Sequence, residues 1–441
     1  MVAIGKRRPP GCAVLVLCVG LAGCGDTAKI PDSETVGPNP TLPTPNKTLI
    51  PTVNVAPAKG WPGEETPKPA AGLRVTALAR NLDHPRWIHV LPNGDILVAE
   101  TNAPKRPERS GLKTMAMGYF MKKAGAGVPS ANRITLLRDA DEDGAAEVRT
   151  TFLKDLNSPF GMALIGDSLY VANTDAILRF PYKEGETEIR DAGTKLADLP
   201  AGPLNHHWTK GLVASRDGKL LYASVGSNSN VAENGIEEET NRAAILEVAV
   251  DGGKTRLFAS GLRNPVGMSI NPETGQLWAV VNERDEIGSD LVPDYLTSVK
   301  DGGFYGWPWS YFGKHVDDRV QPPRPDLVAQ AIVPDYALGN HVAPLGMTFA
   351  VNEGWPVQFR QGAIVGLHGS WNRKPHSGYK VVFVPFKDGR PTGKPVDMLA
   401  GFLSADGEAL GRPVGVEIDR KGGLLVADDV GNVIWRVSPQ D

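Results

Sequence analysis

The chain has 441 residues, and its 47 basic and 50 acidic residues nearly balance, which argues against a nucleic-acid-binding protein. Glycine (50 residues) and proline (37 residues) are both abundant, a composition that favours many short strands joined by tight turns. The three cysteines all lie at or before Cys24, so the rest of the chain offers no thiol for catalysis and no cysteine ligand for zinc.

The first residues have the features of a bacterial lipoprotein signal. A basic region at residues 6–8 precedes an apolar stretch from Cys12 to Leu21, and small residues lead up to Cys24. This stretch is too short to remain in a bilayer as a spanning helix. We therefore predict a signal peptide over residues 1–23, a lipid-modified Cys24, and a periplasmic protein anchored to a membrane. An ordinary signal peptide, cut at a nearby small residue, is the alternative.

Residues 24–71 are predicted to form an extended, disordered tether. The segment is rich in proline and has few large apolar residues, so it cannot bury a core of its own. The folded, catalytic domain is expected over residues 72–441, with its first strand near Leu73.

A repeated strand pattern runs through this domain. A short strand with a Pro-x-Gly start, as at Pro159-Phe-Gly161, often precedes a turn and a second apolar strand. Six units of roughly 60 residues fit four strands and a loop each, so we predict an all-β fold, a six-bladed β-propeller. An ordinary β-sandwich would not repeat such a unit six times. The six turn-and-strand copies are residues 92–100, 166–173, 216–224, 273–280, 361–366 and 420–428.

Two long connections depart from the repeat, residues 103–131 and 288–324. Long loops in a compact domain are usually functional or disordered. In a propeller we expect them to crowd one face, over the central channel.

Two adjacent histidines, His206 and His207, precede the third repeat. Neighbouring side chains at a strand entrance point to opposite faces, so at most one of the two is expected to face the channel. Histidine suits a general base near neutral pH. A structural or solvent-facing histidine is the alternative.

Cationic residues gather near the starts of later repeats. Arg263 and Asn264 immediately precede a predicted inner strand, and arginine suits a carboxylate or a polarised carbonyl. Arg373 and Lys380 lie in a loop dense in histidine and aromatic residues, which is typical of a site for an anion or a flat aromatic ligand. Arg412 adds a cation at the last repeat. Surface arginines and a solvated basic loop are the alternatives.

An acidic stretch, residues 139–144, has the carboxylate spacing that begins a calcium-binding loop, but Thr150 stands where such a loop has a bidentate glutamate. An acidic hairpin turn is the alternative. No HExxH, GxxxxGK[ST], GxSxG or GxGxxG motif occurs, so several common hydrolase, kinase and nicotinamide-dependent enzyme classes lose support.

Taken together, these segments resemble the soluble aldose sugar dehydrogenase and L-sorbosone dehydrogenase family, which uses pyrroloquinoline quinone on a six-bladed propeller. The resemblance covers most of the chain from about Leu73 to Val437. The motifs that carry it are His207 ten residues before the turn at Asp217, Gly261-Leu-Arg-Asn-Pro265, Gly302-Gly-Phe-Tyr-Gly-Trp-Pro308 and Gly378-Tyr-Lys380.

The resemblance implies a role for each candidate. His207 matches the base that takes the proton of the substrate hydroxyl while hydride passes to the quinone. Arg263 would polarise the quinone oxygen that gains charge, and Asn264 would hold the neighbouring edge of the cofactor. The cofactor carboxylates would be neutralised by Lys380, Arg412 and Arg373.

The resemblance also implies calcium against the quinone, as Lewis acid and anchor. The family holds this ion with backbone carbonyls of a Gly-Pro pair, which is missing from residues 283–287 here. Asp285 and Glu286 are therefore only positional candidates. The acidic neighbour of the base is also replaced, by His206.

Two functions from different classes fit these observations. The first is a quinone-dependent dehydrogenase that oxidises a sugar, a sorbosone-like sugar aldehyde or a polyol and delivers electrons to a membrane or periplasmic acceptor. The second is a catalytically inactive propeller that binds a carbohydrate or a protein over the same face. A metal-dependent lactonase would need a channel rich in carboxylates, and the basic residues argue against it.

Overall fold

The computed structural model describes residues 25–48, 51–105 and 112–440. The predicted signal peptide over residues 1–23 and the predicted lipidation site at Cys24 lie outside these residues. Within the described part of the chain, no helix is long and apolar enough to cross a membrane.

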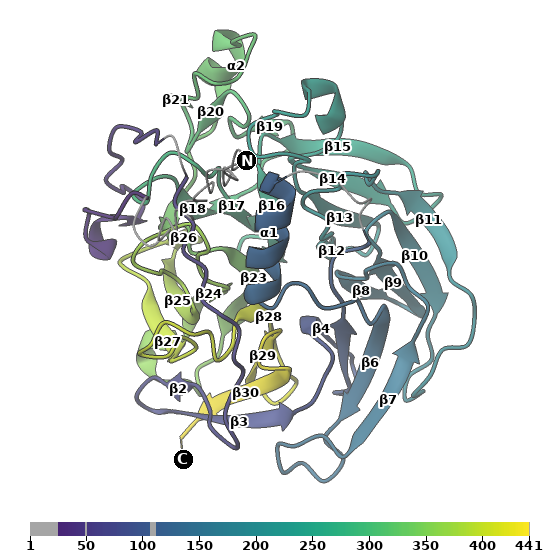
Figure 1. The fold of residues 1–441 in the computed structure, drawn as a ribbon. Coiled ribbons are helices and arrows are strands. Elements are labelled where there is room, and N and C mark those ends of the chain that lie inside the picture. The colour runs from purple at the N-terminus through teal and green to yellow at the C-terminus, as the bar shows by residue number, and fades with distance from the viewer. Residues whose placement is uncertain (1–24, 49–50, 106–111, 441) are drawn as a thin grey trace, which may run out of the picture.

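Six antiparallel sheets are arranged in a ring, so the predicted six-bladed β-propeller is confirmed (Figure 1). From the inner strand outward, blade 1 contains β4 (Pro85–Val90), β5 (Ile96–Glu100), β6 (Arg133–Arg138) and β7 (Val148–Leu153); blade 2 contains β8 (Met162–Ile165), β9 (Ser168–Ala172), β10 (Ala176–Pro181) and β11 (Thr194–Asp198); and blade 3 contains β12 (Leu212–Ala214), β13 (Leu220–Val225), β14 (Ala244–Ala249) and β15 (Thr255–Ser260).

The other three blades complete the ring. Blade 4 contains β16 (Asn264–Ile270), β17 (Leu277–Asn282), β18 (Pro293–Ser298) and β22 (Tyr336–Asn340); blade 5 contains β23 (Pro344–Val351), β24 (Gln361–Leu367), β25 (Lys380–Lys387) and β27 (Val396–Ala400); and blade 6 contains β28 (Pro413–Ile418), β29 (Leu424–Asp428), β30 (Val433–Pro439) and β3 (Leu73–Ala79). Because β3 pairs with β30, blade 6 joins the two ends of the domain.

The six sequence repeats correspond to the second strand of each blade. Most residues of these strands are buried; β5, β9 and β29, for example, are buried at every residue. Each has a hydrogen-bonded neighbour on either side and an adjacent blade against each face, so both faces require apolar residues. This explains why the repeat is visible as a nearly continuous apolar run.

The Pro-x-Gly starts have a packing reason. At Gly267, for example, a Cβ atom would overlap the carbonyl oxygen of Leu345 on the next inner strand. The same close approach to the backbone of the next blade occurs at Gly161, Gly346 and Gly415, and also at Gly211, which is not preceded by the proline. Blade 1 has Trp87 at the corresponding position, and its ring packs on Phe160 with 4.6 Å between centroids. The inner strands therefore enclose a narrow, filled channel.

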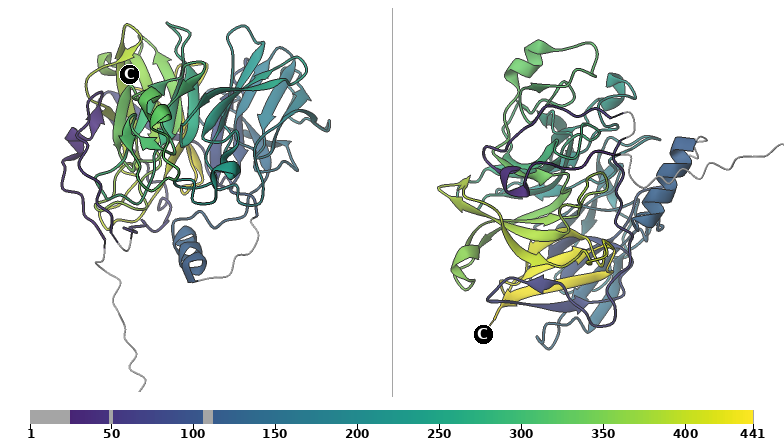
Figure 2. Two further views of the ribbon diagram at one scale, coloured as in Figure 1. Left: turned by 90° about the horizontal axis from the view of Figure 1, so that it is seen from above. Right: turned by 60° about the vertical axis from the view of Figure 1, so that its left-hand side comes forward.

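The loops that could carry function lie at one rim, where the inner strands begin and the second strands end. We call this rim the upper face. The connection after β5 carries α1 (Leu112–Lys123), which stands off this face (Figure 2), as expected for residues 103–131.

The second long connection differs from the expectation of a simple loop over residues 288–324. It supplies β18 to blade 4, pairs β19 (Gly303–Phe304) with β15, and forms a hairpin of β20 (Ser310–Tyr311) and β21 (His315–Val316). The strands were missed because β18 (Pro293–Ser298) starts at a proline and lacks the glycine-turn pattern of the second strands. A short helix, α2 (Pro325–Gln330), follows this hairpin.

The segment before β3 differs from the predicted tether. Its described residues are ordered on the propeller: β1 (Val36–Gly37) pairs with β22, and β2 (Lys68–Pro69) pairs with β27. Ala56 is fully buried, and Trp61 packs edge-on against Phe402 and Trp435. The composition of the segment led to a wrong prediction because few of its residues are apolar, but these few are buried against the propeller. Backbone groups of the segment also form hydrogen bonds with propeller loops.

The contact of Trp61 gives a test of this packing. Its indole Nε1 donates to the buried Oδ2 of Asp428 at 2.7 Å. Because Trp61→Ala removes both the ring contacts and this donor, we expect it to lower the free energy of unfolding by about 2–4 kcal/mol. Chemical denaturation of the chain beginning at Gly25 measures this change. The control is Lys47→Ala, which breaks an exposed ion pair with Asp318 and should cost less than about 1 kcal/mol; equal effects of the two variants would contradict an ordered segment.

Candidate functional site

His207 lies at the upper face, at the entrance to blade 3. Its Nδ1 is 2.8 Å from the carbonyl oxygen of Ser227, and because a carbonyl can only accept, Nδ1 carries the proton and Nε2 holds the lone pair. Burial, then the charges of His206 and Arg263, lowers the pKa of His207 well below its ordinary value. His207 is therefore a neutral imidazole at neutral pH with a basic Nε2. The neighbouring His206 is exposed, so only one of the two histidines faces inward, as predicted.

Arg263 is the buried cation beside this imidazole. Its guanidinium donates to Oδ2 of Asp285 at 2.9 Å, to Oδ1 of Asn230 at 3.0 Å and to the carbonyl of Glu283 at 2.7 Å. Burial alone would raise the pKa of Asp285, but the charge of Arg263 holds that pKa well below its ordinary value. The ion pair fixes the loop that follows β17 against blade 3.

Asn264 follows Arg263 and lies close to His207. A Cβ at Gly226 would overlap both Oδ1 of Asn264 and Cβ of His207, so only glycine allows these two side chains to meet there. Oδ1 of Asn264 is buried and has no hydrogen-bond partner among the described residues. It is thus an acceptor directed into the site and available to a ligand.

A second polar cluster lies at blades 5, 6 and 1. Asp429 accepts from Arg86 at 2.7 Å and contacts Nε2 of His368 at 2.9 Å, and His84 lies 3.6 Å from it. Burial alone would raise the pKa of Asp429, but the positive charges around it lower that pKa strongly. Burial lowers the pKa of His84 to about 4, so this histidine is neutral at neutral pH.

Arg412 belongs to this cluster and is 3% exposed. It makes only long hydrogen bonds, of 3.3 to 3.5 Å, to the carbonyls of Ala56, His368 and Gly369, and it stacks on the ring of Tyr379 at 4.8 Å. Among the described residues no carboxylate forms an ion pair with it, and its Nε is buried without a partner.

The remaining predicted cofactor residues are not part of either cluster. Arg373 is 1% exposed and is fully engaged: its guanidinium donates to Asp32, to the carbonyl of Ser289 and to the carbonyl of Pro375. Lys380 lies 2.7 Å from Asp397 on the outer strand β27, with 35% of its side chain exposed. The structure thus brings His207, Arg263 and Asn264 together, places Arg412 in the second cluster, and gives Arg373 and Lys380 other partners.

The two candidate metal ligands are also separated. The carboxylate of Asp285 is taken up by Arg263 and by Nδ2 of Asn372 at 2.7 Å, and its carbonyl accepts from Asn230 at 3.2 Å. Glu286 turns to Arg319 at 3.4 Å. A cationic guanidinium at each carboxylate competes with a metal ion there, and calcium held by the backbone carbonyls of this loop stays a prediction.

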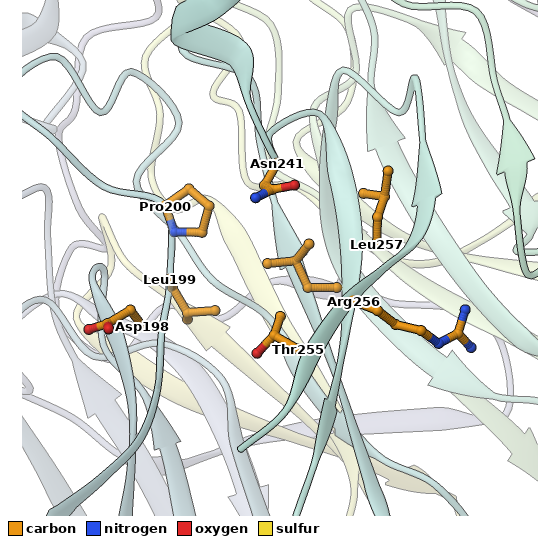
Figure 3. Close-up of a pocket in the computed structure, with 8 residues that line it drawn as sticks. Asp198, Leu199, Pro200, Asn241, Thr255, Arg256 and Leu257 are labelled. Carbon is orange, nitrogen blue, oxygen red and sulfur yellow. The ribbon is translucent and has the colours of Figure 1, made fainter. Parts of the chain in front are cut away.

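Three other features lie apart from the predicted residues. The acidic stretch forms the β6–β7 hairpin turn, with carboxylates of Asp139, Asp141, Asp143 and Glu147 close together. A pocket of about 430 Å³ lies between blades 2 and 3, and none of the predicted site residues lines it (Figure 3). A pocket of about 520 Å³ is different: it is lined by His84 and Asp429 of the second cluster, by residues 58–60 and by residues 128–131.

Buried arginine nitrogens without partners show whether a cofactor that bears carboxylates fits the upper face. Among the described residues, Arg412 has no ion-pair partner, and the Nε atom of Arg86 is buried without a partner, although another nitrogen of Arg86 pairs with Asp429. A buried, unpaired charge is unfavourable unless a ligand compensates it. The residues present therefore fit a ligand that carries carboxylates, with the acceptor of Asn264 and the base of His207 across the channel mouth.

Sequence reasoning missed Arg86, His84 and Asp429. Arg86 occupies the x position of the first inner strand, where blades 2 and 4 have the apolar residues Phe160 and Val266. Blade 3 has a second charged residue at this position, the fully buried Lys210. Charged residues at a position that is apolar in the other four blades were the available signal.

Comparison with known proteins identifies the family. Residues 128–295 and 328–440, more than half of the chain, match the TrAA12-like family. The chain belongs to the TrAA12-like family. The resemblance seen in the sequence motifs is thereby confirmed at the level of the family.

The relatives of this TrAA12-like chain include named enzymes. A pyrroloquinoline quinone-dependent pyranose dehydrogenase of Coprinopsis cinerea is 27% identical over 222 residues, which are 41% of this chain and 30% of that protein. An uncharacterised protein of Borreliella burgdorferi is 28% identical over 299 residues, 65% of this chain and 77% of that protein. The holo structure of the quinone domain of the Coprinopsis enzyme has a TM-score of 0.68 at 22% identity, covering 87% of this chain and all of that domain, and it supports the propeller fold.

A buried acid beside the first cluster gives a pH prediction. Burial raises the pKa of Glu283, which is 2% exposed, from 4.5 to about 7. The folded state therefore keeps a proton that the unfolded state releases, and its stability falls as pH rises from about 4.5 to about 7. Since Glu283→Gln removes this titration, the variant should gain about 2–3 kcal/mol relative to the parent between about pH 5 and about pH 8.

Urea denaturation of both proteins at the two pH values measures this difference. The matched control is Glu353→Gln at an exposed position, which should shift stability equally at both. A difference between Glu283→Gln and the parent that does not change with pH would contradict a protonated Glu283.

Proposed function

We propose that this chain is a pyrroloquinoline quinone-dependent dehydrogenase that oxidises a sugar, a sorbosone-like sugar aldehyde or a polyol. The observation that carries the proposal is the pairing, at one channel mouth, of a neutral imidazole with an available Nε2 and a buried arginine, Arg412, that has no anionic partner. The relatives named as pyrroloquinoline quinone-dependent dehydrogenases support the same assignment.

His207 would act as the general base. Ser227 holds the ring through Nδ1, so Nε2 is directed away from blade 3 and accepts the proton of the substrate hydroxyl. A lowered pKa keeps His207 unprotonated before reaction, and a general base must be unprotonated to act. Bound quinone would supply the hydride acceptor for the substrate carbon, so that the hydroxyl becomes a carbonyl.

Arg263 and Asn264 would position and polarise the ligand. Arg263 already lies within the electrostatic reach of His207, and its charge favours negative charge that develops nearby. Asp285 and Asn230 hold the guanidinium in place, so little reorganisation is required at the moment of reaction. Asn264 offers its free Oδ1 as a fixed acceptor for a donor on the ligand.

Arg412 and Arg86 would hold cofactor carboxylates at the other side of the mouth. Arginine matches the planar geometry of a carboxylate and stays charged when buried. Asp429 and Tyr379 orient the two guanidinium groups from behind. Calcium would contact this loop through the backbone carbonyls of Asp285 and Glu286, because the carboxylates of both residues have cationic partners.

The location and the acceptor complete the proposal. The lipoprotein-like signal supports a periplasmic protein anchored through Cys24. Electrons taken from the substrate would pass to an acceptor in the membrane or in the periplasm.

The base is tested with His207→Gln, which keeps the size and polarity of the side chain but removes the basic nitrogen. We expect kcat for sugar oxidation, followed by reduction of an artificial dye, to fall by about 10²- to 10⁴-fold. Cofactor affinity should change little, because the base is directed at the substrate. If the parent protein binds no quinone at all while folded, the alternative of an inactive carbohydrate- or protein-binding propeller is favoured.

The cofactor anchor is tested with Arg412→Met, with Lys380→Met as the matched control. Removing the unpaired guanidinium should weaken binding of pyrroloquinoline quinone by about 10- to 100-fold, since hydrogen bonds between charged groups are lost. Lys380→Met breaks only the exposed pair with Asp397 and should leave the affinity within about twofold. Isothermal titration gives both values, and a loss of affinity in the lysine variant alone would refute this placement of the cofactor.

A further inference from the structure

Residues 54–61 of the N-terminal segment form a strap across the upper face, from blade 5 to blade 6 (Figure 1). The strap is fixed at both ends. At its start, the amide and the side chain of Asn54 donate to the carbonyls of Trp371 and Arg373 at 2.8 and 2.9 Å. At its end, Trp61 packs on blade 6 and donates to a buried carboxylate there.

Backbone groups alone attach the middle of the strap to the upper face. The amide of Ala409 donates to the carbonyl of Pro57 at 2.8 Å, and the amide of Lys59 donates to the carbonyl of Ala409 at the same distance. The amide of Ala58 donates at 2.9 Å to the carbonyl of Lys123 in α1, a helix that itself stands off this face (Figure 2). The middle of the strap is therefore attached more weakly than its two ends.

The strap covers Arg412, the cofactor anchor of the proposed function. Nη2 of Arg412 donates at 3.3 Å to the carbonyl of Ala56, which is fully buried. On the other side, the ring of Tyr379 lies 4.8 Å from the guanidinium, and its hydroxyl donates to the carbonyl of Ser370 at 2.7 Å. Because Arg412 is only 3% exposed, a carboxylate reaches its guanidinium only when one of these two covers moves.

Of the two covers, the strap is the one that can move locally. The ring of Tyr379 is part of the hydrophobic core between blades 5 and 6, so its displacement would disrupt that core. Residues 55–60 contain no aromatic side chain, and only Ala56 among them is buried. Residues 58–60 also border the pocket of about 520 Å³, so they face open space on that side. Segments with few buried apolar contacts open first in a folded protein.

We propose that residues 55–60 form a gate over Arg412. They leave Ala409 to admit a ligand that carries carboxylates, and they close again behind it, while Asn54 and Trp61 stay attached. The identity of the ligand, pyrroloquinoline quinone, rests on the proposed function. The opening of the strap does not, because it is a property of the protein alone.

Hydrogen exchange of the chain beginning at Gly25 tests this opening without any ligand. Mass spectrometry compares a peptide that covers residues 55–60 with one that covers β29, which is buried at every residue. The hydrogen-bonded amides of Ala58 and Lys59 should exchange about 10²- to 10⁴-fold faster than those of β29, because the strap opens without the domain unfolding. Equal protection of the two peptides would overturn the proposal.

A disulfide allows the gate to be locked. The chain beginning at Gly25 contains no cysteine, and Ala58 and Ala409 are partners in a parallel β-bridge. Paired residues of neighbouring strands have Cα atoms about 4.8 Å apart, a distance that a disulfide can span. Stopped-flow fluorescence measures how fast pyrroloquinoline quinone binds and leaves the oxidised variant Ala58→Cys with Ala409→Cys. Both rate constants should fall by at least about tenfold, because the ligand passes only through the open gate.

The matched control is Ala58→Ser with Ala409→Ser, which has side chains of similar size that cannot be cross-linked. It should bind and release the quinone at the rates of the parent protein. Oxidised protein that binds as fast as this control would refute the gate, even if the quinone binds tightly. If the parent protein binds no quinone, the proposed function fails, and hydrogen exchange still decides whether the strap opens. Thiol titration confirms the cross-link, and thermal melting confirms that each variant is folded.

Discussion

The inner strands of this propeller meet at glycine, and the rest of the site depends on that contact. Where Gly211 passes Val266, or Gly346 passes Val414, no side chain fits between the two backbones. Between neighbouring inner strands the space is filled by backbone and by apolar side chains such as Phe160. Polar groups with access to a ligand are therefore confined to the upper face, where the inner strands begin.

The upper face then determines which segments of the chain can contribute side chains to one site. Inner-strand starts bring His207, Asn264 and Arg412 towards a common mouth, and the loops after the second strands add Asp285 and Asp429 behind them. Arg86 is thereby held by Asp429 of another blade, whereas His207 is held by Ser227 of its own blade. Such support fixes the geometry of a site because the blades themselves are rigidly packed.

Much of the fold could be predicted from sequence, because the second strands are buried on both faces and leave an apolar signature. The partners of charged residues could not be predicted from sequence in this way. Arg373 and Lys380 lie in a stretch that suggests anion binding. The carboxylates that pair with them belong to Asp32 of the N-terminal segment and to Asp397 on an outer strand. The ordered structure of the described residues before β3 was missed for the same reason. It depends on the burial of Trp61 and Ala56 against parts of the chain that are distant in sequence.

The pairing of β3 with β30 has a consequence for how the chain reaches its native state. Blade 6 forms only when residues 73–79 pair with residues 433–439. The ring therefore stays open until nearly the whole domain has been synthesised. Closing so long a loop costs entropy that only the complete set of blade interfaces can offset. A chain that lacked residues 433–439 could therefore not close the ring, even with its other five blades in place.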